Sequence, residues 1–215
     1  MKTEPFERYV DRYEQWFENH RGVYQSELGA VASQLPAQGE GLEIGVGTGR
    51  FAAPLGVRLG VEPSPAMAAV ARQLGIEVVQ AAAESLPFAD ARFDFALMVV
   101  TLCFVDDMPQ SVREAYRVLK PGGSFIVGFI DRESRLGRRY QSRQAESVFY
   151  REAHFFSVAE VIGAMEQAGF ENLSCVQTLF QDEPPDDAPE PVRPGSGQGS
   201  FVVLRGTRPE LEPSC

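Results

Sequence analysis

Hydrophobic residues along the chain alternate between a helical and an extended period. Apolar side chains recur at helical spacing from Phe6 to Phe17 and again from Val23 to Leu35, where Pro36 ends the second pattern. Short apolar runs and helix-like stretches then follow each other to the end of the chain. This alternation is typical of a parallel sheet covered by helices. The pattern therefore predicts two amino-terminal helices followed by an α/β domain.

The same pattern places the later elements. Strands are expected at residues 41–44, 57–61, 76–81, 93–100, 124–130, 173–180 and 201–205, and helices at 50–55, 65–74, 108–118 and 158–168. Ser64 before Pro65 is a helix-cap signal, and Ser157 with Glu160 forms a capping box for the last helix, which Gly169 ends. The acidic, proline-rich and glycine-rich connection 181–200 is expected to be mobile surface.

A ligand-binding turn follows the strand at 41–44. The strand contains the acid Glu43 and breaks into three glycines, Gly45, Gly47 and Gly49. Glycine lets a ligand approach the main chain, and free N–H groups there can face it. A dinucleotide-binding turn requires its third glycine one place later, where this chain has Arg50. A ligand with a sugar and an amino acid, but no diphosphate, therefore fits better.

A second acid, Glu62, ends the strand at 57–61. It lies about twenty residues beyond Glu43, where nucleoside-binding sheets place the carboxylate that accepts both ribose hydroxyls. A lone glutamate after a strand is usually a solvated turn residue. The glycine turn beside it favours ribose binding.

Four motifs in order resemble the class I S-adenosylmethionine-dependent methyltransferases of the small-molecule branch. They are Glu43-Ile-Gly-Val-Gly-Thr-Gly49, Val61-Glu-Pro-Ser64, Ala83-Glu-Ser-Leu-Pro-Phe88 and Arg117-Val-Leu-Lys-Pro-Gly-Gly123. The resemblance covers about residues 38–130 strongly. It implies an α/β, three-layer Rossmann-like sandwich with a seven-stranded, mostly parallel sheet that contains one antiparallel strand, and a donor bound at the carboxyl ends of the first strands.

The resemblance also implies a single domain, 1–215, in four parts. These are an amino-terminal helical cap (1–36), a donor-binding core (37–130), a lid (131–156) and a final helix with the last two strands (157–215).

In the core, the resemblance implies that the turn holds the amino-acid end of the donor and that the following loops hold its adenosine. The implied donor-binding residues of the core are Glu43, Gly45, Val46, Gly47, Glu62, Pro63, Ser64, Met67, Ala83, Glu84, Ser85, Val100 and Thr101. Many relatives have Asp where Ala82 stands, and that Asp accepts a bond from the adenine amino group. Either Glu84 substitutes for it here or the adenine edge is left to water.

The cap and the lid are expected to complete the site. One of Tyr13, Trp16 or Tyr24 is expected to contact the donor, although aromatics at this spacing are more often core residues. The residues expected to meet the acceptor are Phe104, Tyr140, Tyr150 and His154. His154 is also readily explained as a hydrogen-bonded surface residue.

The composition of the chain disfavours several classes of partner and cellular location. The 215 residues carry a net charge of −10, which argues against nucleic acid, and 44% are hydrophobic and 23% charged, as in an ordinary globular domain. No apolar run could cross a membrane and no secretion signal is visible, so a cytoplasmic protein is expected. Cys103, Cys175 and Cys215 are scattered without the spacing of a metal site, so no metal is expected and the thiols are expected to be reduced.

Positive charge gathers in the lid. Its arginines are Arg132, Arg135, Arg138, Arg139, Arg143 and Arg151. Such a run is usually a solvated helix face. A weaker hypothesis is that it attracts an anionic acceptor.

The sequence therefore predicts methyl transfer from S-adenosylmethionine to a small molecule by direct in-line displacement, with S-adenosylhomocysteine as the product. No nucleophile stands beside a base, so no catalytic residue is named. A donor-binding protein without transfer activity is one alternative, and a nicotinamide-dependent oxidoreductase is a less favoured one. The acceptor and the oligomeric state are left open.

Overall fold

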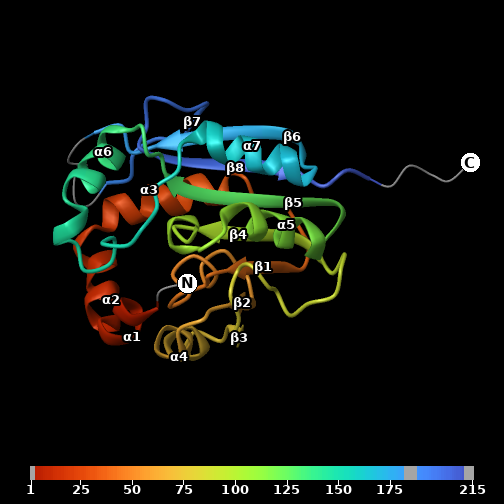
Figure 1. The fold of residues 1–215 in the computed structure, drawn as a ribbon, viewed down its shortest axis with the longest axis horizontal. Helices are drawn as coiled ribbons and strands as arrows, with labels where there is room; N and C mark the ends of the chain where they lie inside the picture. The colour runs from red at the N-terminus through yellow and green to blue at the C-terminus, as the bar shows by residue number, and fades with distance from the viewer. Residues whose placement is uncertain (1–2, 182–187, 211–215) are drawn as a thin grey trace, which may run out of the picture.

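The computed structural model describes residues 3–181 and 188–210, and within them the chain forms one mixed sheet flanked by helices (Figure 1). The strands are β1 (Gly41–Ile44), β2 (Leu59–Val61), β3 (Glu77–Val79), β4 (Phe93–Val99), β5 (Leu119–Ile130), β6 (Glu171–Thr178), β7 (Arg193–Pro194) and β8 (Phe201–Thr207). The helices are α1 (Glu4–Arg8), α2 (Val10–Asn19), α3 (Arg21–Ala32), α4 (Pro65–Gln73), α5 (Met108–Val118), α6 (Arg135–Ser142) and α7 (Val158–Ala168), with 3-10 turns η1 (Leu102–Phe104) and η2 (Gln144–Glu146).

The strand order is β3-β2-β1-β4-β5-β8-β6-β7. Strands β1 to β5 pair in parallel, and β8 is inserted antiparallel between β5 and β6. The predicted architecture is confirmed, and the two-residue β7 adds an eighth strand at the edge. The order reverses at β1, because β2 and β3 lie on one side of it and β4 on the other. In open α/β sheets such a reversal creates a crevice at the carboxyl ends of the strands.

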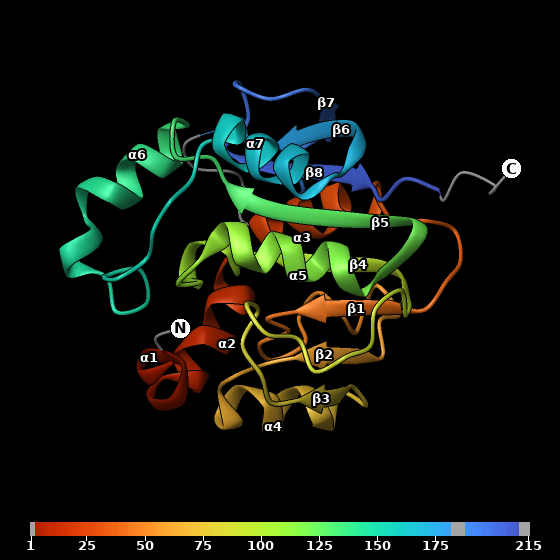
Figure 2. The same ribbon diagram turned by 45° about the vertical axis from the view of Figure 1, so that its right-hand side comes forward.

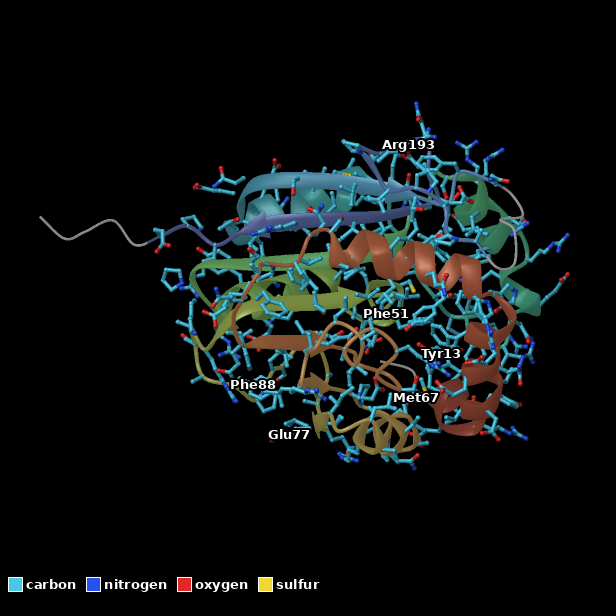
Figure 3. All side chains as sticks on the ribbon, turned by 180° about the vertical axis from the view of Figure 1, so that it is seen from behind. Tyr13, Phe51, Met67, Glu77, Phe88 and Arg193 are labelled. Atoms are coloured by element: carbon cyan, nitrogen blue, oxygen red, sulfur yellow. The ribbon has the colours of Figure 1, made fainter. Side chains whose placement is uncertain are left out.

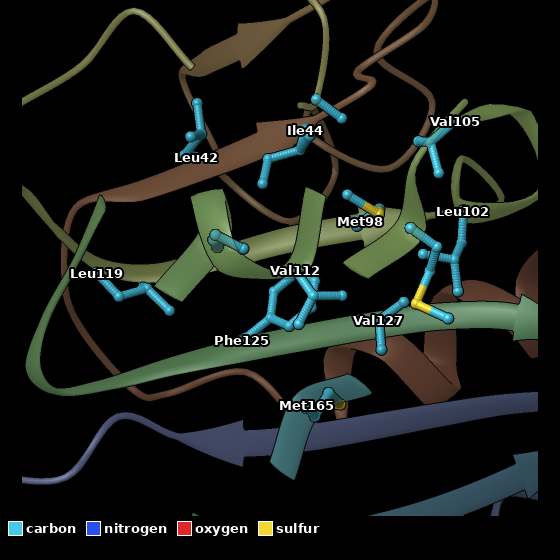
Figure 4. Packing of buried hydrophobic residues seen from close by; sticks show 14 of the residues in the cluster. Leu42, Ile44, Met98, Leu102, Val105, Val112, Leu119, Phe125, Val127 and Met165 are labelled. Carbon is cyan, nitrogen blue, oxygen red and sulfur yellow. The ribbon is translucent and has the colours of Figure 1, made fainter. Parts of the chain in front are cut away.

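Two hydrophobic cores hold the three layers together. On one face, α5 and α7 pack through residues such as Val112 and Met165 against Met98 and Phe125 of the sheet (Figure 4). On the other face, α3 and α4 pack against a second set that includes Leu97. Successive residues of β4 point to opposite faces, and both faces are buried. This explains why the central strands are continuously apolar.

The cap and lid helices stand at one end of the sheet. Helices α1, α2 and α6 lie beyond the arrowheads of β1 and β5, on the side where the carboxyl ends of the parallel strands emerge (Figure 2). Any ligand bound in the crevice would therefore lie between the strand ends and these helices.

Local capping signals are confirmed. The Ser64 side chain accepts a hydrogen bond from the Met67 N–H at the start of α4. The Ser157 capping box is formed at α7, and Gly169 ends that helix in the left-handed conformation.

Several predicted boundaries are wrong. Residues 50–56 form consecutive turns rather than a regular helix, with separate helical bonds from the Ala53 N–H to the Gly49 carbonyl oxygen and from the Leu55 N–H to the Phe51 carbonyl oxygen. The amino-terminal segment contains three helices rather than two, since non-helical backbone at Tyr9 and His20 interrupts it. Strand β5 begins at Leu119 rather than at 124, with an irregular register around its glycines.

The described residues of the connection 181–200 are mostly exposed, as its composition predicts, and two buried side chains anchor it. Glu190 is buried and accepts bonds from the Phe180 and Gln181 N–H groups. The Gln177 side-chain oxygen accepts bonds from the Gln198 and Gly199 N–H groups at 2.9 and 2.7 Å. These two side-chain acceptors and the short pairing of β7 with β6 hold the described part of the connection against the sheet. Residues 182–187 lie outside the described part.

Candidate functional site

The glycine turn after β1 is fixed by close packing. The Gly45 and Val46 N–H groups both donate to the Val61 carbonyl oxygen, at 2.8 and 2.9 Å. Gly45 has φ +74°, and a Cβ there would lie 2.2 Å from Thr101 Cγ2. No other residue fits at that position without displacing the chain. Gly47 has φ +54°, and a Cβ there would lie in ordinary contact with the Tyr13 hydroxyl oxygen and Met67 Cε, at 3.5 and 3.6 Å.

The Glu62 carboxylate points into this turn. Its oxygens accept hydrogen bonds from the Gly47 and Ser64 N–H groups, each at 2.9 Å. The residue is 7% exposed, and burial raises its pKa to about 7 although the two bonds oppose the rise. A carboxylate can accept about four hydrogen bonds, so two positions are free for ligand hydroxyls.

Glu43 lies behind the turn rather than at its surface. It is 1% exposed, and its Oε2 atom has no hydrogen-bond partner in the described part of the chain. Burial, with a smaller contribution from Glu62, raises its pKa to about 8. Its predicted role in orienting the amino-acid end of a ligand stays a prediction, and the unpaired oxygen suits a bridging water.

A cavity of about 460 Å³ opens in front of the turn. Tyr13, Phe51 and Met67 gather at this end of the sheet, whereas Phe88 and Glu77 lie well away from it (Figure 3). The predicted site residues that line the cavity are Tyr13, Trp16, Gly45, Gly47, Glu62, Met67, Val100, Thr101, Phe104, Tyr140 and Tyr150. Its volume lies within the range of about 300–1,000 Å³ that is usual for small-molecule pockets.

The other predicted site residues do not line this cavity. They are Glu43, Val46, Pro63, Ser64, Ala83, Glu84, Ser85, Tyr24 and His154. Ser64 caps α4, and the Tyr24 hydroxyl donates to the Arg50 carbonyl. The Glu84 carboxylate accepts bonds from the Asp106 and Asp107 N–H groups at 2.7 and 3.3 Å. Direct ligand contacts by this group of residues stay predictions.

His154 belongs to a separate hollow. It is exposed and lines an outer cavity of about 930 Å³ that shares Thr3, Phe104 and Phe149 with the inner one. Its N–H donates to the Cys103 carbonyl oxygen at 2.8 Å, and its ring packs on Phe156.

Aromatic side chains from the cap and the lid close the inner cavity. Tyr150 stacks on Tyr140 and on Phe104, with ring centroids 5.0 and 5.7 Å apart. Phe149 of the lid meets Phe6 and Tyr13 of the cap at 5.4 and 6.0 Å. The roof is therefore made by two segments that are far apart in sequence.

Arg50 fastens the cap to the glycine turn. Its Nη2 lies 2.6 Å from Glu14 Oε2 and its Nη1 3.5 Å from Glu18 Oε1, both on α2. Its guanidinium also lies over the Phe17 ring, 5.1 Å from the centroid. Arg50, which stands where a dinucleotide-binding turn has its third glycine, thus binds the cap.

Val100 carries backbone strain at the cavity floor. Its φ is +51°, which is unusual for a β-branched residue and costs about 1–3 kcal/mol. The neighbouring Thr101 hydroxyl lies 3.1 Å from the Gly45 and Val99 carbonyl oxygens and can donate to one of them. The strain is therefore located where the end of β4 meets the glycine turn.

Sequence reasoning missed several residues of the cavity wall. They are Thr3, Phe6, Arg12, Phe17, Glu27, Phe51, Ile130, Ser147 and Phe149, whereas Arg139 and Arg143 belong to the arginine run that the sequence already singled out. Glu27 had a readable signal, because it stands four residues after Val23 and four before Val31 on the apolar stripe of α3. An acid at a buried helical position indicates a special environment. Phe149 had no comparable signal.

Among the residues at 3–181 and 188–210, no helix is long and apolar enough to cross a membrane. No group of three or more His, Cys, Asp or Glu side chains among them is arranged to hold a metal ion.

Comparisons with known proteins agree with this geometry. A family model described as a methyltransferase domain matches residues 42–127. A crystal structure from Thermotoga maritima, described as a SAM-dependent methyltransferase and possible histamine N-methyltransferase, is 53% identical, covers 96% of this chain and 100% of its own, and has a TM-score of 0.93. An uncharacterised protein of Methanocaldococcus jannaschii is 43% identical over 93% of this chain and 96% of its own length.

The residues present fit the donor that this family uses. The glycine turn leaves backbone room, Glu62 keeps two free acceptor positions, and Glu43 keeps an unpaired oxygen. The similarity to a methyltransferase argues against the hypothesis of a nicotinamide-dependent oxidoreductase, as does Arg50, which stands where a dinucleotide-binding turn requires its third glycine. The chain belongs to the class I S-adenosylmethionine-dependent methyltransferases, enzymes that use S-adenosylmethionine as the methyl donor.

Proposed function

We propose that the protein transfers a methyl group from S-adenosylmethionine to a small molecule enclosed in the 460 Å³ cavity. The observation that carries this proposal is the roof, because aromatic rings from the cap and the lid cover the strand ends and bound a cavity of small-molecule size. The net charge of −10 argues against a nucleic-acid acceptor. The description of the Thermotoga maritima relative, which names a small amine, agrees with such an acceptor.

The donor would be held by the glycine turn and its neighbours. The Glu62 carboxylate would accept the ribose hydroxyls, and the thioether of Met67 would pack against the adenine. Burial and then the nearby Glu62 charge raise the pKa of Tyr13, so its hydroxyl stays protonated and can donate. Facing Gly47, this hydroxyl suits the carboxylate of the donor's amino-acid end.

The chemistry is direct displacement. The donor supplies a methyl group that the positive sulfonium already activates. An acceptor atom that the cavity walls hold in line with the donor's carbon–sulfur bond would attack the methyl carbon, and such orientation can supply about 7–11 kcal/mol. The walls around Val100, Thr101, Phe104 and Ile130 would exclude water and align the acceptor.

The test is a transfer assay with methyl-labelled donor. The purified protein would be incubated with dialysable metabolites, with RNA and with proteins from one cell extract. Label in the dialysable fraction is expected. Label confined to RNA or protein would contradict the proposed acceptor class.

The alternative is a protein that binds the donor without transferring its methyl group. Micromolar binding of S-adenosylhomocysteine in calorimetry, with no labelled product in any fraction, would favour that alternative. Absence of donor binding would contradict both functions.

A further inference from the structure

Glu27 is a buried acid in the wall of the cavity. It lies on α3 and is 4% exposed. Within residues 3–181 and 188–210 no charged group or hydrogen-bond donor is paired with its carboxyl group, and its oxygens are not among the fully buried unpaired atoms, so they reach the cavity. Burial alone raises its pKa to about 8.

The other two buried acids of the site differ from it. Glu62 accepts two backbone N–H bonds, and Glu43 accepts one from Ala52. A buried carboxyl without a partner costs stability, and such groups call for an explanation. A ligand that brings a positive charge to Glu27 would remove the cost.

The surroundings of Glu27 suit a cation. Rings of Tyr13, Trp16, Phe51 and Tyr140 line the same cavity, and the faces of aromatic rings attract positive charge. Burial, and then the negative charge of Glu27, raise the pKa of Tyr140 to about 12. The Tyr140 hydroxyl of the lid is therefore close enough to Glu27 to interact with its charge. Tyr140 therefore stays neutral beside Glu27.

The three cavity arginines do not neutralise Glu27. Arg12, Arg139 and Arg143 line the cavity, but each is exposed and none pairs with Glu27 within the described residues. Water solvates the guanidinium groups of exposed arginines, so these groups need no ligand to offset a desolvation cost. The anionic acceptor that the lid arginines suggest is the less favoured class, because the desolvated charge in this cavity is an acid.

We propose that the acceptor is a small amine that enters as an ammonium ion, and that Glu27 is the residue that binds it. This inference rests on the proposed function, because it names the class of acceptor for the same cavity.

The group transfer balances with Glu27 in this position. An N–H bond of the ammonium breaks and its proton passes to the Glu27 carboxylate, which leaves the nitrogen with a lone pair. That pair forms the nitrogen–methyl bond while the carbon–sulfur bond breaks and its electrons stay on sulfur. The products are S-adenosylhomocysteine and a methylated ammonium, and Glu27 returns its proton to solvent after release.

The first experiment measures binding, independently of transfer. Wild type saturated with S-adenosylhomocysteine is titrated in a calorimeter with butylamine, benzylamine, 2-phenylethylamine and tyramine, and with the alcohols of the same carbon skeletons. Amines are expected to bind at least tenfold more tightly than the matched alcohols. If alcohols bind equally well, or no amine binds, the proposal is overturned.

The second experiment uses Glu27→Gln, which keeps the shape and removes the charge, and Glu27→Asp, which keeps the charge on a shorter side chain. Amine affinity and kcat/KM are expected to fall tenfold or more in Glu27→Gln and less in Glu27→Asp, while S-adenosylhomocysteine affinity stays within twofold of wild type. Glu166→Gln, an exposed site on α7, is the matched control and should leave all values unchanged. Unchanged amine binding in Glu27→Gln would overturn the proposal.

Thermal unfolding provides a check that needs no ligand. At pH 8.5 Glu27→Gln should melt at the same temperature as wild type or higher, because it removes an unpaired buried charge. A lower melting temperature would reveal a protein partner for Glu27 and contradict the proposal. Loss of S-adenosylhomocysteine binding in wild type would instead refute the proposed function, which separates the two failures.

Discussion

The sharpest prediction concerns Glu62 and donor binding. In the substitution Glu62→Gln, the side-chain amide keeps one acceptor oxygen and places an NH₂ group against the N–H of Gly47 or Ser64, both of which donate at 2.9 Å in wild type. The charge that would strengthen bonds from the ribose hydroxyls is also lost. A hydrogen bond to a charged group contributes about 1.5–3 kcal/mol, so the dissociation constant for S-adenosylhomocysteine should rise by about 10- to 150-fold.

The prediction extends to pH. The pKa of Glu62 is about 7 in the ligand-free protein, while ligand hydroxyls bind the ionised form better. Below pH 7 the carboxylate must lose a proton before it can bind the donor, so wild-type affinity should fall about tenfold per unit as the pH decreases. This contribution should be absent in Glu62→Gln. Because Glu43 also titrates nearby, with a pKa of about 8, the wild-type minus variant difference is the quantity to compare.

Calorimetry with S-adenosylhomocysteine between pH 6 and pH 8.5 is the assay. Glu77→Gln, at an exposed position in β3, is the control and should behave as wild type. Equal affinities of Glu62→Gln and wild type at pH 8 would refute the reasoning. A variant that is weaker but keeps the full pH slope would show that another group carries the titration.

Three further outcomes are expected. Burial raises the pKa of Glu43 from 4.5 to about 8, so between these values the folded state binds more protons than the unfolded state. The free energy of unfolding should therefore fall as the pH rises from 5 to 8. In urea titrations, Glu43→Gln should reduce that slope by up to about 1.4 kcal/mol per pH unit. Val100→Gly relieves a positive φ and should change the free energy of unfolding by under about 1 kcal/mol, whereas Val99→Gly should cost 2 kcal/mol or more; equal losses would contradict the assigned strain. Arg50→Ala removes the tie to Glu14 and should speed limited proteolysis within residues 1–36, as seen by mass spectrometry, without changing the melting temperature by more than a few degrees.

The elements with strong local signals were predictable. Ser64, Ser157 and Gly169 mark helix ends through hydrogen bonds made within a few residues, so the sequence contains the whole interaction. The apolar run of β4 indicates a doubly covered strand because both of its faces are buried. The turns at 50–56 were missed because their local bonds resemble those of a helix without forming a continuous series.

Some residues of the candidate site were likewise predictable from the sequence, and others were not. Gly45, Gly47 and Glu62 follow strands whose ends must meet at one edge of a parallel sheet, so order and spacing placed them together. Phe149 and Glu27 reach the cavity from elements more than a hundred residues apart, and local patterns carry no information on that distance.

By itself, the sequence determined the succession of strands and helices along the core, the glycine turn and the acid that follows the next strand, because these depend on local backbone preferences and short spacings. Only the tertiary structure decided which rings close the cavity, that Arg50 holds the cap, and that no described residue pairs with Glu27. The physical reason is that burial and pairing of a side chain depend on segments folded against it from elsewhere in the chain. The spacing of hydrophobic residues indicates which face of a helix or strand is buried, but it does not indicate which segment packs against that face.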